Sequence, residues 1–169
     1  MTRGALPKPA LRPFLPADAP VLAETFQASI EELTEDDYSE AQRVAWASQA
    51  DDDATFAARL AANLTLVATL EGTPVGFLSL KGADQIEMLY VHPGAVGNGV
   101  ATLLYDAIEK LARARGAKRL VADVSDTAEE FFRRRDFQPQ RRNSTPIADE
   151  WLATTTMEKR LAANEGTAS

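Results

Sequence analysis

Residues 86–104, IEMLYVHPGAVGNGVATLL, join a short apolar run to an amphipathic one through a loop that carries three glycines. The run Ile86–Val91 predicts a buried strand, and the apolar spacing over residues 98–115 predicts a helix. The main-chain N–H groups in the first turn of a helix are unpaired and lie at the positive end of its dipole. Glycines at that point let the backbone approach a ligand closely, so the junction favours a bound pyrophosphate.

The same junction also has an ordinary structural interpretation, because a strand often enters a helix through a tight glycine turn. It is not a Walker loop, since no Gly-Lys-Ser/Thr follows, and it does not match the Gly-x-Gly-x-x-Gly pattern of dinucleotide-binding folds. The loop alone therefore leaves both an anion site and a plain turn open.

The rest of the chain alternates between helical and strand patterns. Before the junction, the sequence predicts an edge strand, three helices and a strand hairpin, at residues 10–15, 18–33, 39–46, 51–60, 64–70 and 75–80. After it, a strand, a short helix and two further strands are predicted at residues 120–124, 127–135, 137–142 and 151–159. This order of elements predicts one mixed α/β domain.

The composition is that of a globular domain: 45% of the 169 residues are hydrophobic and 25% are charged. We expect residues 1–9 and 162–169 to be disordered tails around a domain that spans residues 10–161. The absence of cysteine excludes disulfides, thiolate zinc sites and a cysteine nucleophile, and it suits a cytoplasmic protein. The longest apolar runs are too short to span a membrane, and we expect no signal peptide.

The net charge of −7 argues against a nucleic-acid-binding protein, whose affinity depends on neutralising phosphates. The charge is uneven, because residues 1–60 carry eleven acidic and five basic side chains, whereas residues 110–142 carry ten basic and five acidic ones. One interpretation is two solvated faces. The other is an acidic side that attracts a cationic substrate and a basic side that attracts a polyanionic cofactor.

The strand and its loop resemble motif A of the GNAT superfamily of acyl-CoA N-acyltransferases. That motif reads Gln/Arg-x-x-Gly-x-Gly/Ala; Gly99 and Ala101 match its two small positions, whereas Val96 replaces the Gln or Arg. Residues 128–137, AEEFFRRRDF, resemble a second GNAT signature, with Phe132 in the place of its usual Tyr. Similarity to the YafP-like group of acetyltransferases lies at Tyr38-Ser39, Gln42, Ala45-Trp46 and residues 88–91.

The resemblance extends over about residues 10–161 and implies a mixed, mostly antiparallel central sheet flanked by helices. It also implies acetyl-CoA as cosubstrate, no metal, and N-acetylation of a primary amine of a small molecule or peptide. The main chain of Leu89, Tyr90 and Val91 would hold the pantetheine arm, and Ser125 would replace a common pantetheine-binding Asn. The implied pyrophosphate cradle comprises Gly97, Asn98, Gly99, Val100, Ala101 and Thr102.

Amide formation requires a neutral amine, and an alkyl ammonium with a pKa near ~10.4 must first lose a proton. Glu87 is the candidate base, and the period-two alternation of a strand predicts that it shares a face with Leu89. An exposed or ion-paired Glu87 is the alternative. His92 is the other candidate base, but it directly follows the strand, where a solvated turn residue is expected.

The remaining catalytic roles are harder to assign from the residue types. The tetrahedral intermediate needs a preorganised donor, for which the main-chain N–H of Tyr90 or Val91 is the candidate. Phe132 cannot donate a proton to the leaving thiolate, so the general acid is unassigned. Tyr38 and Trp46 lie on the helices that cover the acceptor groove in this family and are the candidate substrate contacts, although Trp46 also suits a core position.

Three consecutive bases, Arg133–Arg135, point in different directions on a short helix, which favours solvated side chains. Some of them, with Arg141 or Lys118, could instead meet cofactor phosphates. Two rivals to an enzyme remain: an acyl-CoA sensor without turnover, favoured by Phe132 and Val96, and an interaction protein whose acidic helices hold a basic partner. Relatives often dimerise, so a homodimer is compatible with the sequence.

Overall fold

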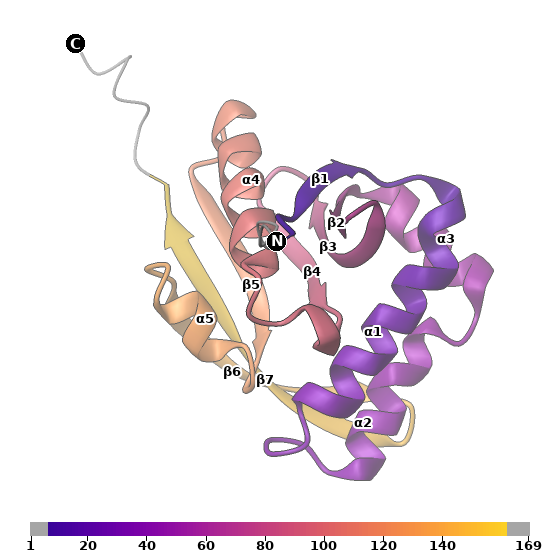
Figure 1. The fold of residues 1–169 in the computed structure, drawn as a ribbon. Coiled ribbons are helices and arrows are strands. Elements are labelled where there is room, and N and C mark those ends of the chain that lie inside the picture. Colours follow the sequence, from indigo (N-terminus) through magenta and orange to yellow (C-terminus); the bar gives the residue numbers. More distant parts are fainter. Residues whose placement is uncertain (1–6, 162–169) are drawn as a thin grey trace, which may run out of the picture.

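The computed structural model describes residues 7–161, which form a seven-stranded sheet with helices on both faces (Figure 1). The strands lie in the order β1-β2-β3-β4-β5-β7-β6, and every neighbouring pair is antiparallel except β4 and β5. The predicted fold class, a mixed and mostly antiparallel sheet flanked by helices, is therefore confirmed. Of the predicted tails, residues 1–6 and 162–169 lie outside the described residues, and residues 7–9 precede β1.

The elements occur in the predicted order, and the last hairpin is longer than predicted because β6 continues through a polar sequence. The strands are β1 (Ala10–Pro13), β2 (Leu64–Leu70), β3 (Thr73–Lys81), β4 (Gln85–Val91), β5 (Arg119–Ser125), β6 (Gln138–Ile147) and β7 (Glu150–Arg160). The helices are α1 (Ala19–Leu33), α2 (Glu40–Ala47), α3 (Asp53–Ala62), α4 (Val100–Ala114) and α5 (Glu129–Arg133). Within residues 7–161, no helix has the length and apolarity needed to cross a membrane.

Local sequence signals explain where several of these elements begin. Ser39 and Gln42 form a capping box at the start of α2, with reciprocal hydrogen bonds of 3.1 and 2.9 Å. Pro13 lies on the edge strand β1, where its missing N–H costs no ladder bond. Asp18 directly precedes α1, and its carboxylate binds the guanidinium of Arg12 at 2.7 Å instead of a helix N–H.

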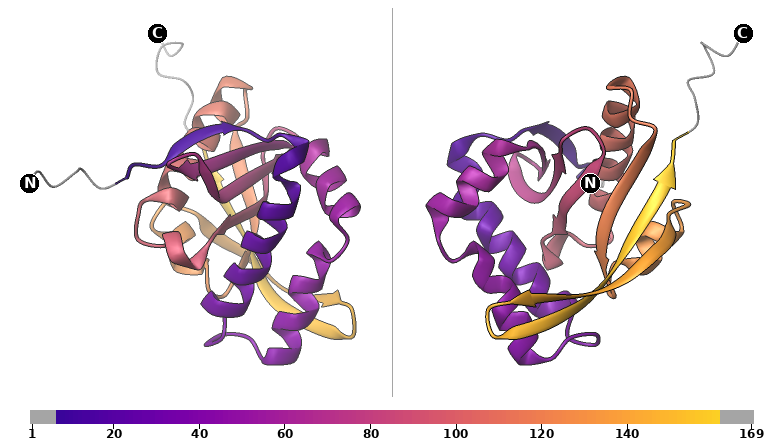
Figure 2. Two further views of the ribbon diagram at one scale, coloured as in Figure 1. Left: turned by 45° about the vertical axis from the view of Figure 1, so that its right-hand side comes forward. Right: turned by 180° about the vertical axis from the view of Figure 1, so that it is seen from behind.

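The sheet separates two apolar clusters. Figure 2 shows the sheet and the helices that cover its two faces from two further directions. On one face, α4 and α5 contribute the buried side chains Leu104, Tyr105, Ile108 and Phe132. On the other face, α1, α2 and α3 contribute the buried side chains Phe26, Ile30, Trp46, Phe56 and Leu60. Both clusters bury side chains of the central strands, so helices hold β3 and β4 from either side.

The sheet is interrupted between β4 and β5, its parallel neighbours. They pair through only two residue pairs, Gln85 with Val121 and Ile86 with Ala122. Beyond Ile86 the two strands separate, and β4 continues paired with β3 alone. The fold therefore leaves one edge of β4 without a strand partner in the middle of the sheet.

Candidate active site

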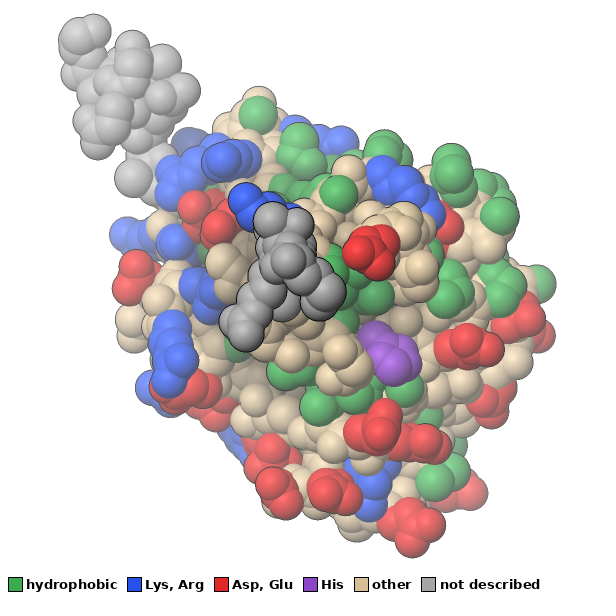
Figure 3. Space-filling view, viewed as in Figure 1, with side chains coloured by type: hydrophobic (Ala, Val, Ile, Leu, Met, Phe, Trp, Pro, Cys, Tyr) green, Lys and Arg blue, Asp and Glu red, His purple; other side chains and the backbone are tan. Residues whose placement is uncertain are grey.

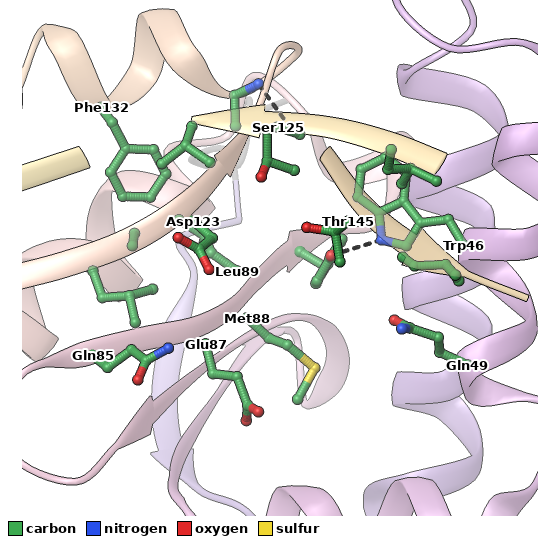
Figure 4. A pocket seen from close by; sticks show the side chains of 18 of the residues that line it. Trp46, Gln49, Gln85, Glu87, Met88, Leu89, Asp123, Ser125, Phe132 and Thr145 are labelled. Atoms are coloured by element: carbon green, nitrogen blue, oxygen red, sulfur yellow. Dashed lines mark hydrogen bonds between the residues drawn. The ribbon is translucent and has the colours of Figure 1, made fainter. Parts of the chain in front are cut away.

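A cavity of about 310 Å³ opens where β4 and β5 separate (Figure 4). Its walls come from both strands, from the β6–β7 hairpin and, on the helical side, from Trp46 of α2 and Gln49, which follows α2. Two carboxylates, Glu87 of β4 and Asp123 of β5, belong to opposite sides of the gap. The cavity therefore combines unpaired strand main chain with acidic side chains.

A β-bulge in β4 determines where Glu87 points. Ser79 of β3 faces Met88, and the next residue, Leu80, faces Ile86. Glu87 is thus an extra residue on β4, and a bulge of this kind locally redirects side chains.

The carboxylate of Glu87 turns toward α3 and its C-terminal end. Its Oε1 accepts a hydrogen bond from Nε of Arg59 at 3.3 Å, and its Oε2 accepts one from the side-chain amide of Asn63. Leu89 packs instead on the cluster beneath α4. The prediction that Glu87 and Leu89 share a face is therefore wrong, because the bulge interrupts the alternation. The side chain of Glu87 is ion-paired, yet it keeps 18% exposure and lines the cavity.

Asp123 is a cavity residue that the sequence interpretation missed. It is exposed between the buried Ala122 and Val124, and its Oδ1 accepts a hydrogen bond from the Thr156 hydroxyl at 2.6 Å. Strand alternation alone places Asp123 on the opposite face from its neighbours. What the sequence does not reveal is that β5 is the strand that faces β4 across the gap.

Trp46 and Tyr90 form a hydrogen-bonded pair on the cavity wall. The indole Nε1 of Trp46 donates to the Tyr90 hydroxyl at 3.2 Å, and the Tyr90 ring packs edge-on to Phe26 with centroids 4.6 Å apart. Burial raises the pKa of Tyr90 to about 12. Within residues 7–161 the hydroxyl proton of Tyr90 has no acceptor, so this group is a donor available to the cavity.

The main-chain N–H groups of β4 alternate between β3 and the gap. The N–H of His92, just after the strand, donates to the carbonyl of Val75 at 2.8 Å, on the β3 side. Alternation then directs the N–H of Tyr90 to β3 and those of Leu89 and Val91 to the gap. Of the two predicted oxyanion donors, the N–H of Val91 therefore faces the gap, whereas that of Tyr90 faces β3.

Tyr38 does not line the cavity, and its placement argues against the predicted contact with substrate. Its side chain is buried, and its hydroxyl donates to the Ala153 carbonyl at 2.6 Å and accepts from the Asp126 N–H at 2.9 Å. Its ring lies edge-on to that of Trp46 with centroids 5.3 Å apart. Tyr38 therefore joins β7 to the loop after β5 and packs behind Trp46. Trp46 is a core residue that also lines the cavity, so its predicted contact with substrate stays a prediction.

The loop between β4 and α4 presents a group of unpaired main-chain N–H groups. Gly97 and Gly99 have φ angles of 93° and 76°, and a Cβ on either would meet nothing within 4 Å. In the part of the chain that the structure describes, no acceptor is found for the N–H groups of Gly97, Gly99, Val100, Ala101 and Thr102. This geometry is that of an anion site at a helix N-terminus.

Two polar residues of this loop serve the loop itself. The main-chain N–H and the side-chain amide of Asn98 both donate to the Ala95 carbonyl, at 3.3 and 3.0 Å. Asn98 is thus the one member of the predicted cradle whose N–H is already used. His92 is exposed, and its Nδ1 accepts from the Gly94 N–H at 3.0 Å, as a turn residue rather than a cavity residue.

Hydroxyl groups line the far end of the cavity. Ser125 lies at the end of β5, where its Oγ accepts from the Ala128 N–H at 3.2 Å. Its partner on β7, Thr154, has a buried Oγ1 without a hydrogen-bond partner in the described structure. A buried hydroxyl on a cavity wall is a place where a ligand can supply the missing bond. No sequence signal singles out Thr154, because it is the first of three consecutive threonines.

Comparisons with known proteins agree with this geometry. The acetyltransferase (GNAT) domain family matches residues 34–161. The uncharacterized N-acetyltransferase YafP of Escherichia coli (strain K12) is 30% identical over 142 residues, which are 84% of this chain and 89% of YafP.

Solved structures extend the likeness to nearly the whole chain. A GCN5-related N-acetyltransferase from Rhodopseudomonas palustris is 60% identical, with a TM-score of 0.90 over 95% of this chain and 100% of that one. The PaiA N-acetyltransferase from Thermoplasma acidophilum shares the fold at 19% identity, with a TM-score of 0.72 over 91% of this chain and 99% of that one. The chain therefore belongs to the GNAT acetyltransferase family.

Proposed function

We propose that this protein transfers the acetyl group of acetyl-CoA to the primary amine of a cationic small molecule or peptide. The observation that carries the proposal is the gap between β4 and β5, which Leu89 and Val91 face with N–H groups that β3 does not bind, beside a cavity lined by Leu89 and Glu87. An unpaired strand edge is a template for an extended ligand with amide groups. The pantetheine arm of coenzyme A has this chemistry.

The loop before α4 supports the same cosubstrate. Five unpaired N–H groups and the open space above Gly99 suit a pyrophosphate, and the apolar Val96 leaves those N–H groups in place. The PaiA structure, which has this fold, was solved in complex with coenzyme A.

In the proposed reaction, Glu87 takes the proton of the acceptor ammonium, directly or through water. Arg59 and Asn63 hold its carboxylate in place, and the N–H of Val91 donates to the developing oxyanion. The Tyr90 hydroxyl, with a pKa raised to about 12, stays protonated at neutral pH and can donate but not act as a base. Tyr90 therefore offers the leaving thiolate the proton that Phe132 cannot supply.

The charges of the cavity favour a cationic acceptor. Glu87 and Asp123 place two carboxylates around the gap, whereas Arg59, the cavity's basic side chain, is already paired with Glu87. An ammonium group near Asp123 would gain a charge-assisted hydrogen bond, and a carboxylate there would be repelled.

A second function, acyl-CoA sensing without turnover, is favoured by one specific observation. Phe132 is buried on the cavity wall in the place where related sequences carry a tyrosine acid. A sensor would bind acetyl-CoA and release no thiol with any amine.

Thermal melting with acetyl-CoA, followed by a thiol-release assay over a panel of amines, tests both functions. We expect acetyl-CoA to raise the melting temperature, and a diamine or a lysine-like amine to give the fastest thiol release. Gly99→Glu should abolish the melting shift, because its side chain would fill the anion site and repel phosphates. Gly99→Ala is the control, since it introduces the same backbone strain without a charge. Binding without thiol release would support the sensor, and no melting shift in the wild type would refute both functions.

A further inference from the structure

Three consecutive arginines end α5 and follow it, but only two of them are neutralised by carboxylates. Arg133 and Arg134 pair with Glu129 and Glu130 one helical turn earlier, at 2.8 and 3.1 Å. Among residues 7–161, Arg135 has no carboxylate within 4.0 Å. Its positive charge is therefore not balanced locally, in contrast to its two neighbours.

Aromatic and main-chain contacts hold Arg135 in a fixed position. Its Cζ lies 3.5 Å from the centroid of the Phe131 ring, and its Nη1 donates to the Phe131 carbonyl at 3.0 Å. Its Nη2 donates to Oγ1 of Thr102 at 2.7 Å. A guanidinium has five N–H donors, so three remain free for a ligand.

Thr102 belongs to the first turn of α4, whose N–H groups form the anion site. The guanidinium of Arg135 therefore lies beside that site, although it comes from a different part of the chain. Because the Thr102 hydroxyl accepts from Arg135, its own proton is left to donate elsewhere. At Val96, where motif A usually places Gln or Arg, this chain has an apolar side chain that is 55% exposed.

We propose that Arg135 binds the pyrophosphate of coenzyme A and supplies the side-chain contact that Val96 cannot make. This proposal rests on the proposed function and assigns a residue to its cosubstrate site. Arginine suits this role because its planar donors match phosphate oxygens in pairs. Stacking on Phe131 fixes the position of the Arg135 guanidinium before the ligand arrives, which reduces the conformational entropy lost on binding.

The test compares Arg135→Gln with Arg134→Gln by calorimetric titration with three ligands. Coenzyme A carries the pyrophosphate and a 3′-phosphate, dephospho-coenzyme A carries the pyrophosphate alone, and pantetheine carries neither. We expect Arg135→Gln to weaken the first two ligands by about 10-fold or more, as for loss of a hydrogen bond to a charged group. Pantetheine binding should be unchanged, and Arg134→Gln should stay within about 2-fold of wild type for all three.

Two further measurements separate phosphate binding from a structural role. The affinity of Arg135→Gln for coenzyme A should depend less on salt than that of the wild type, because one charge pair is lost. Arg135→Lys keeps the charge without the paired donors, so it should bind coenzyme A less tightly than wild type and more tightly than Arg135→Gln. If Arg135→Gln fails to fold, the lysine variant still decides, since unchanged affinity for dephospho-coenzyme A would overturn the role of paired donors.

The outcomes distinguish this proposal from the proposed function. A wild-type protein that binds no coenzyme A would refute the proposed function itself. If the wild type binds coenzyme A, and Arg135→Gln binds it as tightly as Arg134→Gln does, only the role of Arg135 is overturned. An effect that disappears with dephospho-coenzyme A would move the contact to the 3′-phosphate and overturn the assignment to the pyrophosphate.

Discussion

The hydroxyl groups of Tyr38 and Tyr90 belong to rings that pack around one indole, that of Trp46, but they have different partners. Both hydrogen-bonding capacities of the Tyr38 hydroxyl are used by main-chain groups of Ala153 and Asp126. The Tyr90 hydroxyl accepts from Trp46 and keeps its proton free within the described structure. Burial raises the pKa of both tyrosines, so neither is ionised at neutral pH.

Tyr90→Phe tests the hydroxyl as a proton donor. A phenol whose pKa is raised to about 12 stays protonated through pH 10, so its contribution should be present throughout that range. We expect kcat to fall by about 10-fold or more at every pH from 6 to 10, with the shape of the profile unchanged. Tyr38→Phe is the matched control, because it should lower the melting temperature while kcat stays near wild type. A shifted pH midpoint in Tyr90→Phe would contradict this role.

Glu87→Gln removes basicity while it keeps the size of the side chain and its ability to accept a hydrogen bond. If Glu87 is the base, Glu87→Gln should lower kcat by about 100-fold. The dissociation constant of coenzyme A should stay within about 2-fold of the wild-type value. Stopped-flow thiol release and calorimetry measure the two quantities. Glu130→Gln, at an exposed ion pair on α5, controls for the loss of one charge. A wild-type rate across the whole pH range would eliminate Glu87 as the base.

At the scale of elements, the close approach of α4 to β3 depends on Gly76. A Cβ at this position would lie 2.9 Å from Cγ1 of Val100 and 3.1 Å from the Tyr90 carbonyl. Val100 is the first residue of α4. Because Gly76 has no side chain, the N-terminal end of α4, with its anion site, can pack close to β3.

Gly76→Ala should therefore lower the free energy of unfolding by about 1–3 kcal/mol through overpacking, and it should weaken coenzyme A binding. Urea unfolding and calorimetry measure the two effects. The double variant Gly76→Ala, Val100→Ala removes the clashing methyl, so it should be more stable than the sum of the single changes predicts. Strict additivity would show that the two residues do not meet.

The sequence predicted the elements well because their signals are local. The apolar periods of α1 and α4, the capping box at Ser39 and the edge position of Pro13 all involve residues close in the chain. The site depended on pairings between distant segments, such as the short contact of β4 with β5. The bulge at Glu87 arises from the register of β4 against β3. Asp123 lies across the gap from Glu87 because the sheet order places β5 next to β4. Neither feature could be read from the sequence of β4 or β5 alone.

At the scale of the whole molecule, charge is segregated by element. Figure 3 shows acidic side chains gathered over the end formed by α1 and α2, and basic ones on the side of α4 and α5. The exposed acids at and after the end of α1 include Glu31, Glu32, Glu35, Asp36 and Asp37. Such a field concentrates cations on the side from which Trp46 lines the cavity.

We therefore expect salt to raise the Michaelis constant for a cationic amine and to leave kcat nearly unchanged. The Debye length falls from ~10 Å at 0.1 M salt to ~3 Å at 1 M, which screens charges beyond the cavity wall. Acetyl-CoA must be saturating, because salt also weakens phosphate binding. The double variant Glu35→Gln, Asp36→Asn should show a weaker salt dependence. If the best acceptor is anionic, or if its Michaelis constant does not change with salt, the acidic side chains do not attract substrate and form only a solvated face.

The brief pairing of β4 with β5 divides the sheet into a four-stranded leaf, β1 to β4, and a three-stranded leaf, β5 to β7. Two residue pairs form the hinge of these leaves, and past that hinge no hydrogen-bond ladder fixes the angle between them. A ligand that forms hydrogen bonds with the free edge of β4 and fills the gap would fix the angle between the two parts of the sheet. Donor binding would thus shape the acceptor's half of the cavity, so we expect the protein to bind its two proposed substrates in a compulsory order, acetyl donor first.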